Sequence, residues 1–256
     1  MKFLNKTFPF FICLCISISA GAQTTISATT ILSDLKNNKD IIYKNAVITG
    51  VLDFTFMEEQ LKSKAIKTKR WWNTDKKKPI ENQIKSRISF ENCTFESPVY
   101  AYINEENSQN TFVANFEEDV LFKNCTFKEE ALFKYSNFEQ SANFSGSNFK
   151  DASTFKYAKF HAESSFFNTI FAASSSFKYA SFRKNVSFAK STFWESATFK
   201  YSKFGNGVSF NQTQFKEDLN IKYTKVTGEF NITGMSVTYD IDAKYTKING
   251  QPFQYN

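Results

Sequence analysis

The residues of this chain that could do chemistry are cations placed beside aromatic rings. Lys-Tyr pairs recur at a constant step of 22 residues, each directly after an apolar residue. If that step is one turn of a repeating structure, the ammonium groups form a row in which like charges repel, and salt screens this only in part. A linear polyanion would relieve the repulsion. The lysines of this row are Lys134, Lys156, Lys178, Lys200, Lys222 and Lys244.

A second group of cations surrounds two tryptophans in the N-terminal third. Residues 62–87 carry ten Lys or Arg against two Asp or Glu, a formal charge of +8. Cations beside aromatic rings suit acidic partners such as lipopolysaccharide, anionic lipid headgroups or nucleic acid. The alternative is a solvated loop whose tryptophans fold back onto the protein. The candidate contacts are Lys67, Lys69, Arg70, Trp71, Trp72, Lys76, Lys77 and Lys78.

Catalytic chemistry finds little support in the sequence. The chain has a single histidine, His161, and no Gly-rich phosphate loop or metal-ligand spacing. Cys93 and Cys125 both stand in an Asn-Cys-Thr-Phe context, which fits either two buried thiols or a disulfide between neighbouring coils. Two cysteines without histidine partners are weak evidence for a metal. We therefore expect no enzyme activity and no catalytic, cofactor or metal site.

A phenylalanine ladder must position these residues. From Phe116 to Phe215 the spacing between phenylalanines alternates between six and five, and smaller apolar residues continue the rhythm to Ile248. Neither a helix nor a single strand has this period. A small residue usually stands two positions before each ladder residue, so both side chains face the same side of a short strand. Four ladder positions per 22 residues predict four walls per turn, with coils about 4.8 Å apart.

At this point the chain resembles a known family. Ser136-Asn137-Phe138, Ala142-Asn143-Phe144 and Ser147-Asn148-Phe149 are similar to the motif of pentapeptide-repeat proteins, and the resemblance covers about residues 86–250. It implies an all-β, right-handed quadrilateral β-helix. The coil of this family has 20 residues, so the extra residue on alternate sides predicts bulged or widened corners. A three-sided β-helix like that of polysaccharide lyases is the rival, and four inward rings per turn disfavour it.

The remaining segments predict the organisation of the chain. Residues 1–22 have a positive start, a short apolar run and a small-x-small end, which together indicate a signal peptide and export to the periplasm, the cell surface or the medium. The run is too short to span a bilayer, so the mature chain should lack a transmembrane span. We expect a capping helix within residues 23–40 and a β-solenoid over 41–256, with insertions at about 57–85 and 97–112. The last coil is either plugged by Phe253 and Tyr255 or paired with a second copy, as a homodimer.

These features favour a non-enzymatic structural or interaction module of the bacterial cell envelope. Its partner would be a protein or an anionic envelope component, bound through the basic insertion and the Lys-Tyr wall. One alternative is a carbohydrate-active β-helix enzyme. Another, implied by some members of the resembled family, is a nucleic-acid mimic that inhibits topoisomerases. That role needs an acidic surface and a cytoplasmic target, whereas this chain has a basic wall and an export signal, so nucleic acid is not the expected partner.

Overall fold

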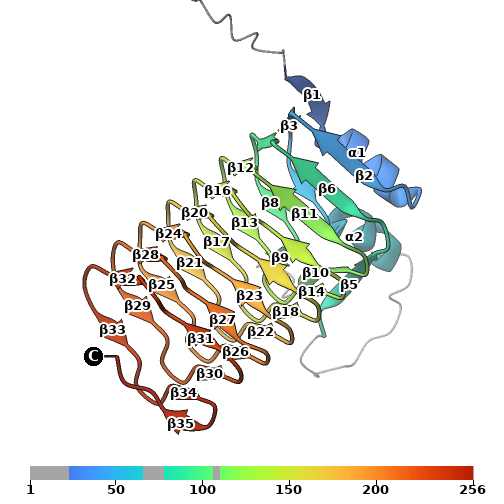
Figure 1. The fold of residues 1–256 in the computed structure, drawn as a ribbon. Coiled ribbons are helices and arrows are strands. Elements are labelled where there is room, and N and C mark those ends of the chain that lie inside the picture. Colours follow the sequence, from blue (N-terminus) through green and yellow to red (C-terminus); the bar gives the residue numbers. More distant parts are fainter. Residues whose placement is uncertain (1–22, 66–77, 106–109, 256) are drawn as a thin grey trace, which may run out of the picture.

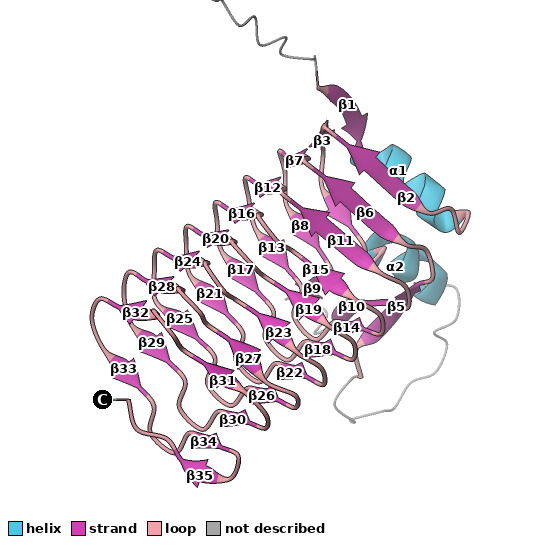
Figure 2. Ribbon diagram, in the orientation of Figure 1, coloured by secondary structure: helices cyan, strands magenta, loops and turns pink. Residues whose placement is uncertain are grey.

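Four stacks of short strands make up the protein. The computed structural model describes residues 23–65, 78–105 and 110–255. The strands form four mainly parallel sheets, called walls 1 to 4 here in the order in which the chain crosses them. Successive coils lie side by side along one axis, and the helices lie at the N-terminal end (Figures 1 and 2). The predicted four-sided β-solenoid is therefore confirmed.

Each wall takes one strand from each coil. Wall 1 contains β2 (Ile41–Lys44), β6 (Ile88–Glu91), β11 (Val120–Lys123), β15 (Ala142–Asn143), β19 (Ser164–Ser165), β23 (Val186–Ser187), β27 (Val208–Ser209) and β31 (Phe230–Asn231). Wall 2 contains β1 (Thr24–Ser27), β3 (Ala46–Thr49), β7 (Thr94–Phe95), β12 (Thr126–Phe127), β16 (Asn148–Phe149), β20 (Ile170–Phe171), β24 (Thr192–Phe193), β28 (Gln214–Phe215) and β32 (Ser236–Val237).

The other two walls are built in the same way. Wall 3 contains β4 (Leu52–Asp53), β8 (Val99–Tyr100), β13 (Ala131–Leu132), β17 (Ser153–Thr154), β21 (Ser175–Ser176), β25 (Ala197–Thr198), β29 (Leu219–Asn220) and β33 (Ile241–Asp242). Wall 4 contains β5 (Ile80–Ile84), β9 (Tyr102–Glu105), β10 (Asn110–Phe116), β14 (Asn137–Phe138), β18 (Lys159–Phe160), β22 (Ser181–Phe182), β26 (Lys203–Phe204), β30 (Lys225–Val226), β34 (Lys247–Ile248) and β35 (Gln251–Pro252).

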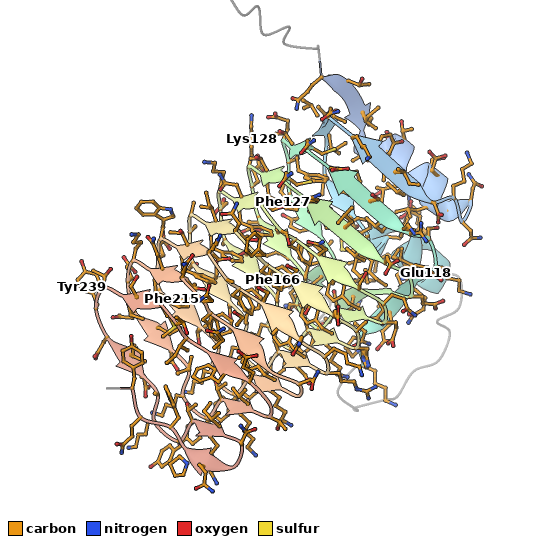
Figure 3. The ribbon with its side chains drawn as sticks, in the orientation of Figure 1. Glu118, Phe127, Lys128, Phe166, Phe215 and Tyr239 are labelled. Atoms are coloured by element: carbon orange, nitrogen blue, oxygen red, sulfur yellow. The ribbon has the colours of Figure 1, made fainter. Side chains whose placement is uncertain are left out.

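The core is a set of stacked phenylalanine columns inside the four walls. Parallel pairing places each residue on the one 22 positions away, as with Phe127 and Phe149. Phe166 is fully buried, and its ring lies 5.1 Å from that of Phe144 and 4.9 Å from that of Phe188, with planes within 4°. Burying each ring stabilises the fold by roughly 1.5–3 kcal/mol. Figure 3 labels three ladder residues along the axis, among them Phe166 and Phe215.

The two kinds of spacing correspond to two kinds of corner. The five-residue corners join wall 1 to wall 2 and wall 3 to wall 4, and each contains a residue with positive φ, such as Asn124 (φ 53°) or Tyr179 (φ 61°). The six-residue corners join wall 2 to wall 3 and wall 4 to wall 1. The extra residue of the 22-residue coil therefore lies at alternate corners, as the spacing predicts.

Buried hydroxyl groups tie each coil to the one before it. The inward-facing small residue at a five-residue corner donates a hydrogen bond to the carbonyl oxygen of a ladder residue 25 positions earlier. Examples are Thr169 to Phe144 (3.0 Å) and Ser202 to Phe177 (2.7 Å). This bond satisfies both a buried hydroxyl and a corner carbonyl, which would otherwise carry a desolvation cost. It explains why Ser and Thr are frequent among the small residues of the pattern.

The N-terminal end is covered by a helix, as expected. Helix α1 (Ala28–Lys36) begins after Ser27, whose hydroxyl accepts a hydrogen bond from the Thr29 amide, and it buries Ile31 and Leu35 against the first coil. The range 23–40 that was expected to hold the capping helix also holds a strand. Strand β1 precedes the helix and pairs with β3, because Ile26 occupies the ladder position of Ile48.

The insertions are shorter than the sequence suggested. Helix α2 (Met57–Ala65) lies in the first insertion, but β5 at the end of the expected 57–85 range pairs with β10 in wall 4. Similarly, β8 lies within the expected 97–112 range and pairs with β13 in wall 3. Ile84 and Ala101 fill these ladder positions instead of phenylalanine, which is why the phenylalanine spacing missed them.

The C-terminal coil is closed on one side by its own chain. Strand β35 turns back antiparallel to β34, and Phe253 packs against the core with its ring 5.2 Å from that of Phe230. Tyr255 remains 41% exposed. The expected plug is thus formed by Phe253. Within the described ranges, neither helix has the length and apolar character needed to cross a bilayer. The predicted signal peptide lies outside the described residues.

Replacing Phe166 by Ala should lower the free energy of unfolding by about 3–5 kcal/mol, because it opens a cavity in a column packed on both sides. The adjacent Phe167 lies outside the ladder and is 41% exposed, so F167A is a matched control with a much smaller effect. Urea denaturation midpoints of the two variants provide the measurement. Equal shifts would contradict the placement of Phe166 inside the solenoid.

Candidate functional site

The six Lys-Tyr pairs lie together at the corner between walls 3 and 4. Each pair follows an inward-facing ladder residue of wall 3, and the parallel register places one pair in every coil. We call this row the Lys-Tyr edge. It consists of Lys134-Tyr135, Lys156-Tyr157, Lys178-Tyr179, Lys200-Tyr201, Lys222-Tyr223 and Lys244-Tyr245. The structure thus brings all six lysines of the predicted row to one corner.

The tyrosine rings of the edge form a continuous stack. Neighbouring ring centroids are 4.7–4.9 Å apart and their planes are within 18° of parallel. The rings are partly exposed, with Tyr179 at 37% and Tyr245 at 58%. Partial burial, and then the neighbouring phenols Tyr157 and Tyr201, raise the pKa of Tyr179 above its usual value. Its hydroxyl therefore stays protonated at neutral pH and can donate a hydrogen bond.

The lysines of the edge lie beside this stack. Each ammonium nitrogen lies 5.0–5.8 Å from the ring centroid of the tyrosine that follows it. Partial burial, followed by the like charges of Lys134 and Lys178, lowers the pKa of Lys156. Lys222 has a carboxylate nearby, with Nζ 3.7 Å from Oδ2 of Asp242. Lys156, in the middle of the edge, therefore has cations of the same row as charged neighbours.

The backbone does not require tyrosine at these positions. Every tyrosine of the edge has φ between 59° and 64°, a region that costs a residue with a β-carbon roughly 1–2 kcal/mol. The other five-residue corner has the same positive φ and uses Asn124, Gly146, Asn168, Lys190 and Gln212 in successive coils. The repeats thus differ in sequence at the corner between walls 1 and 2 but keep Lys-Tyr in six coils at the corner between walls 3 and 4. This difference indicates a role for the Lys-Tyr pair beyond turning the chain.

A groove runs along wall 4 beside the tyrosine stack. Its volume is about 640 Å³. One side is the tyrosine stack, the floor is the outward face of the wall 4 strands, and the other side is the row of residues that follows the ladder. The lining residues used below are Tyr157, Tyr179, Lys159, Ser181, Lys203 and Arg183. Arg183 was not anticipated from the sequence, although its place directly after ladder residue Phe182 puts it on this wall.

The single histidine also lines this groove. The Nε2 atom of His161 lies 3.7 Å from Oε1 of Glu139, and the His161 side chain is only 21% exposed. Among the described residues, no group of three or more His, Cys, Asp and Glu side chains is arranged to hold a metal ion.

The predicted basic insertion is described only at its end. Seven of its eight candidate contacts lie outside the described residues: Lys67, Lys69, Arg70, Trp71, Trp72, Lys76 and Lys77. Lys78 is described and exposed. It precedes Pro79, which lines the N-terminal end of the wall 4 groove. The chain therefore leaves the insertion at the end of the groove that the Lys-Tyr edge borders.

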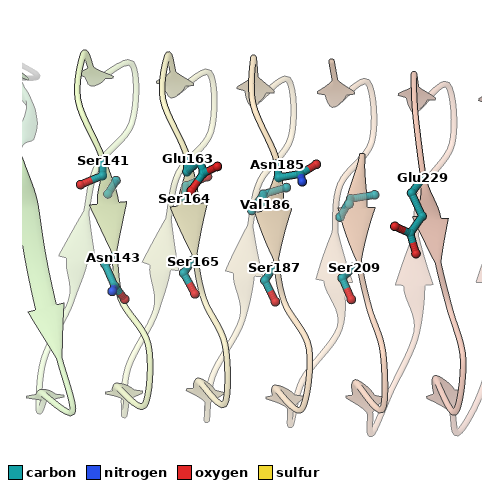
Figure 4. A pocket seen from close by; sticks show the side chains of 12 residues that line it. Ser141, Asn143, Glu163, Ser164, Ser165, Asn185, Val186, Ser187, Ser209 and Glu229 are labelled. Atoms are coloured by element: carbon teal, nitrogen blue, oxygen red, sulfur yellow. The ribbon is translucent and has the colours of Figure 1, made fainter. Parts of the chain in front are cut away.

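Wall 1 carries a different, smaller hollow of about 440 Å³. Asn143, Ser165 and Ser187 project from successive strands at the same level, and Glu163 and Glu229 lie on a neighbouring strip (Figure 4). This surface offers hydroxyl, amide and carboxylate groups. This hollow therefore differs in charge from the wall 4 groove, which is lined by Lys159, Lys203 and Arg183.

The two cysteines occupy the same corner in neighbouring coils. Cys93 and Cys125 are both free thiols and both 1% exposed. A hydrogen bond with Cys125 lowers the pKa of Cys93 to about 7, against the effect of burial. Burial, and then the bond with Cys93, raises the pKa of Cys125. The sequence fitted either two buried thiols or a disulfide, and in the structure the two cysteines are buried thiols.

Both thiols should react slowly with Ellman's reagent in the native protein and completely after unfolding. The reason is that burial keeps the reagent away from both sulfur atoms, so the rate is limited by access and does not depend on the pKa of Cys93. The time course of absorbance at neutral pH, with and without denaturant, provides the measurement. Fast labelling of one equivalent without denaturant would contradict this burial.

Replacing Lys156 by Gln should raise the melting temperature at low ionic strength, by a stability gain of less than about 1 kcal/mol. The gain should disappear in high salt, since it comes from removing like-charge repulsion. K150Q, an exposed lysine of wall 2, is the matched control. Because folding lowers the pKa of Lys156, the unfolded chain holds this proton more tightly. The wild-type free energy of unfolding should therefore rise as pH increases through the lowered pKa. For the salt series, a stability gain of K156Q that stays constant at all salt concentrations would contradict the repulsion.

Comparison with known proteins agrees with this geometry. A model of pentapeptide repeats matches nine copies over residues 114–159 and 177–225. A solved structure that aligns with the chain is HetL, a pentapeptide repeat protein involved in heterocyst differentiation regulation from the cyanobacterium Nostoc. It is 9% identical, with a TM-score of 0.26, covering 89% of this chain and all of HetL. No curated protein matches the sequence. The nine repeats, together with the four-sided coil, identify residues 114–159 and 177–225 as pentapeptide repeats within a β-solenoid.

Proposed function

We propose that this protein is a non-enzymatic interaction module of the bacterial cell envelope that binds a linear polyanion along the Lys-Tyr edge. Pentapeptide-repeat proteins are generally non-enzymatic. The observation that supports binding is the row of six ammonium groups repeated once per coil, with a tyrosine beside each. The envelope location rests on the predicted signal peptide, and the basic insertion would add further cations.

Electrostatic repulsion within the row explains why an anion would bind. At coil spacing, neighbouring ammonium groups interact unfavourably even in a high dielectric. A polymer with regularly spaced negative charges supplies one counter-charge per coil and relieves that repulsion. The lysines of the row are mostly half-buried but still in contact with solvent, so each contact contributes little alone and affinity depends on several coils acting together.

The alternative functions lack a supporting observation in the described residues. A carbohydrate-active enzyme would need paired carboxylates facing one site, whereas Glu163 and Glu229 are separated by three coils along wall 1. A nucleic-acid mimic would need an acidic face, and the best-formed charged face here is cationic. A homodimer through the C-terminal coil remains a separate proposal for the solution state, tested by light scattering.

Heparin is a suitable first probe for the proposal. The triple variant K156Q/K178Q/K200Q should bind heparin about tenfold more weakly, since each exposed ion pair contributes about 0.5 kcal/mol. The control is K128Q/K150Q/K190Q, which removes the same charge from exposed lysines at the corners of wall 2 and keeps near wild-type affinity. Titration calorimetry at two salt concentrations measures both. Equal losses in the two triple variants would indicate a net-charge effect and refute the edge as the site.

A further inference from the structure

The tyrosine stack presents ring edges and hydroxyl groups to a ligand, because neighbouring rings cover the ring faces. The parallel rings of Tyr157, Tyr179 and Tyr201 are 4.7 Å apart, so nothing can insert between them. The edge of an aromatic ring carries the positive part of its quadrupole. Ring edges, phenol hydroxyls and ammonium groups all carry positive charge or a hydrogen-bond donor. Together they therefore favour ligands that are anions or hydrogen-bond acceptors.

This arrangement disfavours a single-stranded nucleic acid. Proteins that bind single strands without sequence preference use aromatic side chains on which bases stack face to face. In this stack an open face remains only at an end, such as that of Tyr245. The groove on wall 4 is lined instead by tyrosines of the stack, whose ring faces cover one another, and by cationic side chains. A ligand there must be recognised through charge and hydroxyl contacts.

The floor of the groove sets the distance between its cations. The outward residues of four successive wall 4 strands are Asn137, Lys159, Ser181 and Lys203. Lys159 and Lys203 therefore lie two coils apart, about 9.6 Å at a coil spacing of about 4.8 Å, with the neutral Ser181 between them. That distance is comparable to an extended disaccharide. The next strand places Lys225 directly beyond Lys203. Arg183, on the far side of the groove, adds a planar guanidinium suited to a carboxylate or sulfate.

We propose that the wall 4 groove binds an acidic polysaccharide, extended parallel to the solenoid axis. Its carboxylate or sulfate groups contact Lys159, Lys203 and Arg183, and its hydroxyl groups contact Ser181 and the tyrosine hydroxyls. This inference rests on the proposed function, since the tyrosines of the Lys-Tyr edge form one side of the groove. Charge complementarity selects the occupant, because the acidic groups at the N-terminal end of the groove, Glu81 and Glu139, leave the segment around Arg183 as its most cationic part.

The test compares groove variants with edge variants on two probes. Oligogalacturonate is the acidic-polysaccharide probe, and the oligonucleotide poly(dT) is the nucleic-acid probe, both measured by titration calorimetry at moderate salt. K159Q/K203Q should weaken oligogalacturonate binding roughly fivefold, as two exposed ion pairs are lost. K150Q/K190Q is the control, and Lys190→Gln is structurally matched because Gln212 occupies the same corner one coil later.

A second variant tests the hydroxyl contacts. Y157F/Y179F/Y201F keeps the stack and its packing but removes three hydroxyls, so it should fold normally and bind oligogalacturonate more weakly than the wild type. Circular dichroism and the melting temperature verify the fold. Unchanged affinity in this variant would overturn the role of the tyrosine hydroxyls, and the polysaccharide assignment with it.

The outcomes separate this inference from the proposed function. If K156Q/K178Q/K200Q weakens binding but K159Q/K203Q does not, polyanion binding at the edge stands and the groove proposal is refuted. If poly(dT) binds as tightly as oligogalacturonate and the groove variants weaken both equally, the ligand class is wrong. If neither set of variants differs from the control, both proposals are refuted.

Discussion

Parallel hydrogen bonding between coils of equal length is the constraint on which the rest of this structure depends. From Phe116 to Ile248 each strand pairs with its counterpart 22 residues away, so whatever side chain a position carries is placed on its own copy. Inside the tube this stacks phenylalanines into columns that no water reaches. A change in coil length at one turn would shift every later column out of register, which explains why the insertions loop out from the ends of regular strands.

The same constraint creates the surface features. A lysine and a tyrosine that recur in each coil must form a row, whether or not the row is favourable for the fold. The tyrosines gain stacking contacts but occupy a left-handed backbone region, and the lysines contact the tyrosine rings but repel one another. The fold tolerates these costs because the phenylalanine columns supply a large excess of buried apolar surface. Stability thus resides inside the tube, and recognition can be placed outside it.

Much of this architecture could be predicted from residue spacing alone. The six-five rhythm from Phe116 to Phe215 specifies four walls, and the Lys-Tyr step specifies one edge, because a periodic backbone converts sequence separation directly into position. The errors arose where periodicity was interrupted. Ile84 and Ala101 hold ladder positions without being phenylalanine, and β1 pairs before the helix begins.

The site was only partly predictable for a similar reason. The lysine row could be predicted from the constant 22-residue spacing of the lysines. The groove beside it could not, because it depends on how corner and strand side chains are oriented. Arg183 lacks a repeated counterpart, since Glu139 and His161 precede it in the same column. The covering of the tyrosine faces likewise depends on the parallel ring planes, which only coordinates reveal.

The buried hydroxyl bonds give the solenoid a direction. Each donor, such as Thr169 or Ser202, reaches back to a carbonyl of the coil before it and never forward to the next. A newly added turn can form these hydroxyl bonds only with the coil on its N-terminal side, whereas backbone amides of walls 1 and 3 donate forward to the next coil, as Phe133 does to Thr154 (2.8 Å). Helix α1 covers the open side of the first turn. The architecture is thus suited to vectorial assembly, in which a chain that emerges from its N-terminus extends a template that its own leading segment has already built.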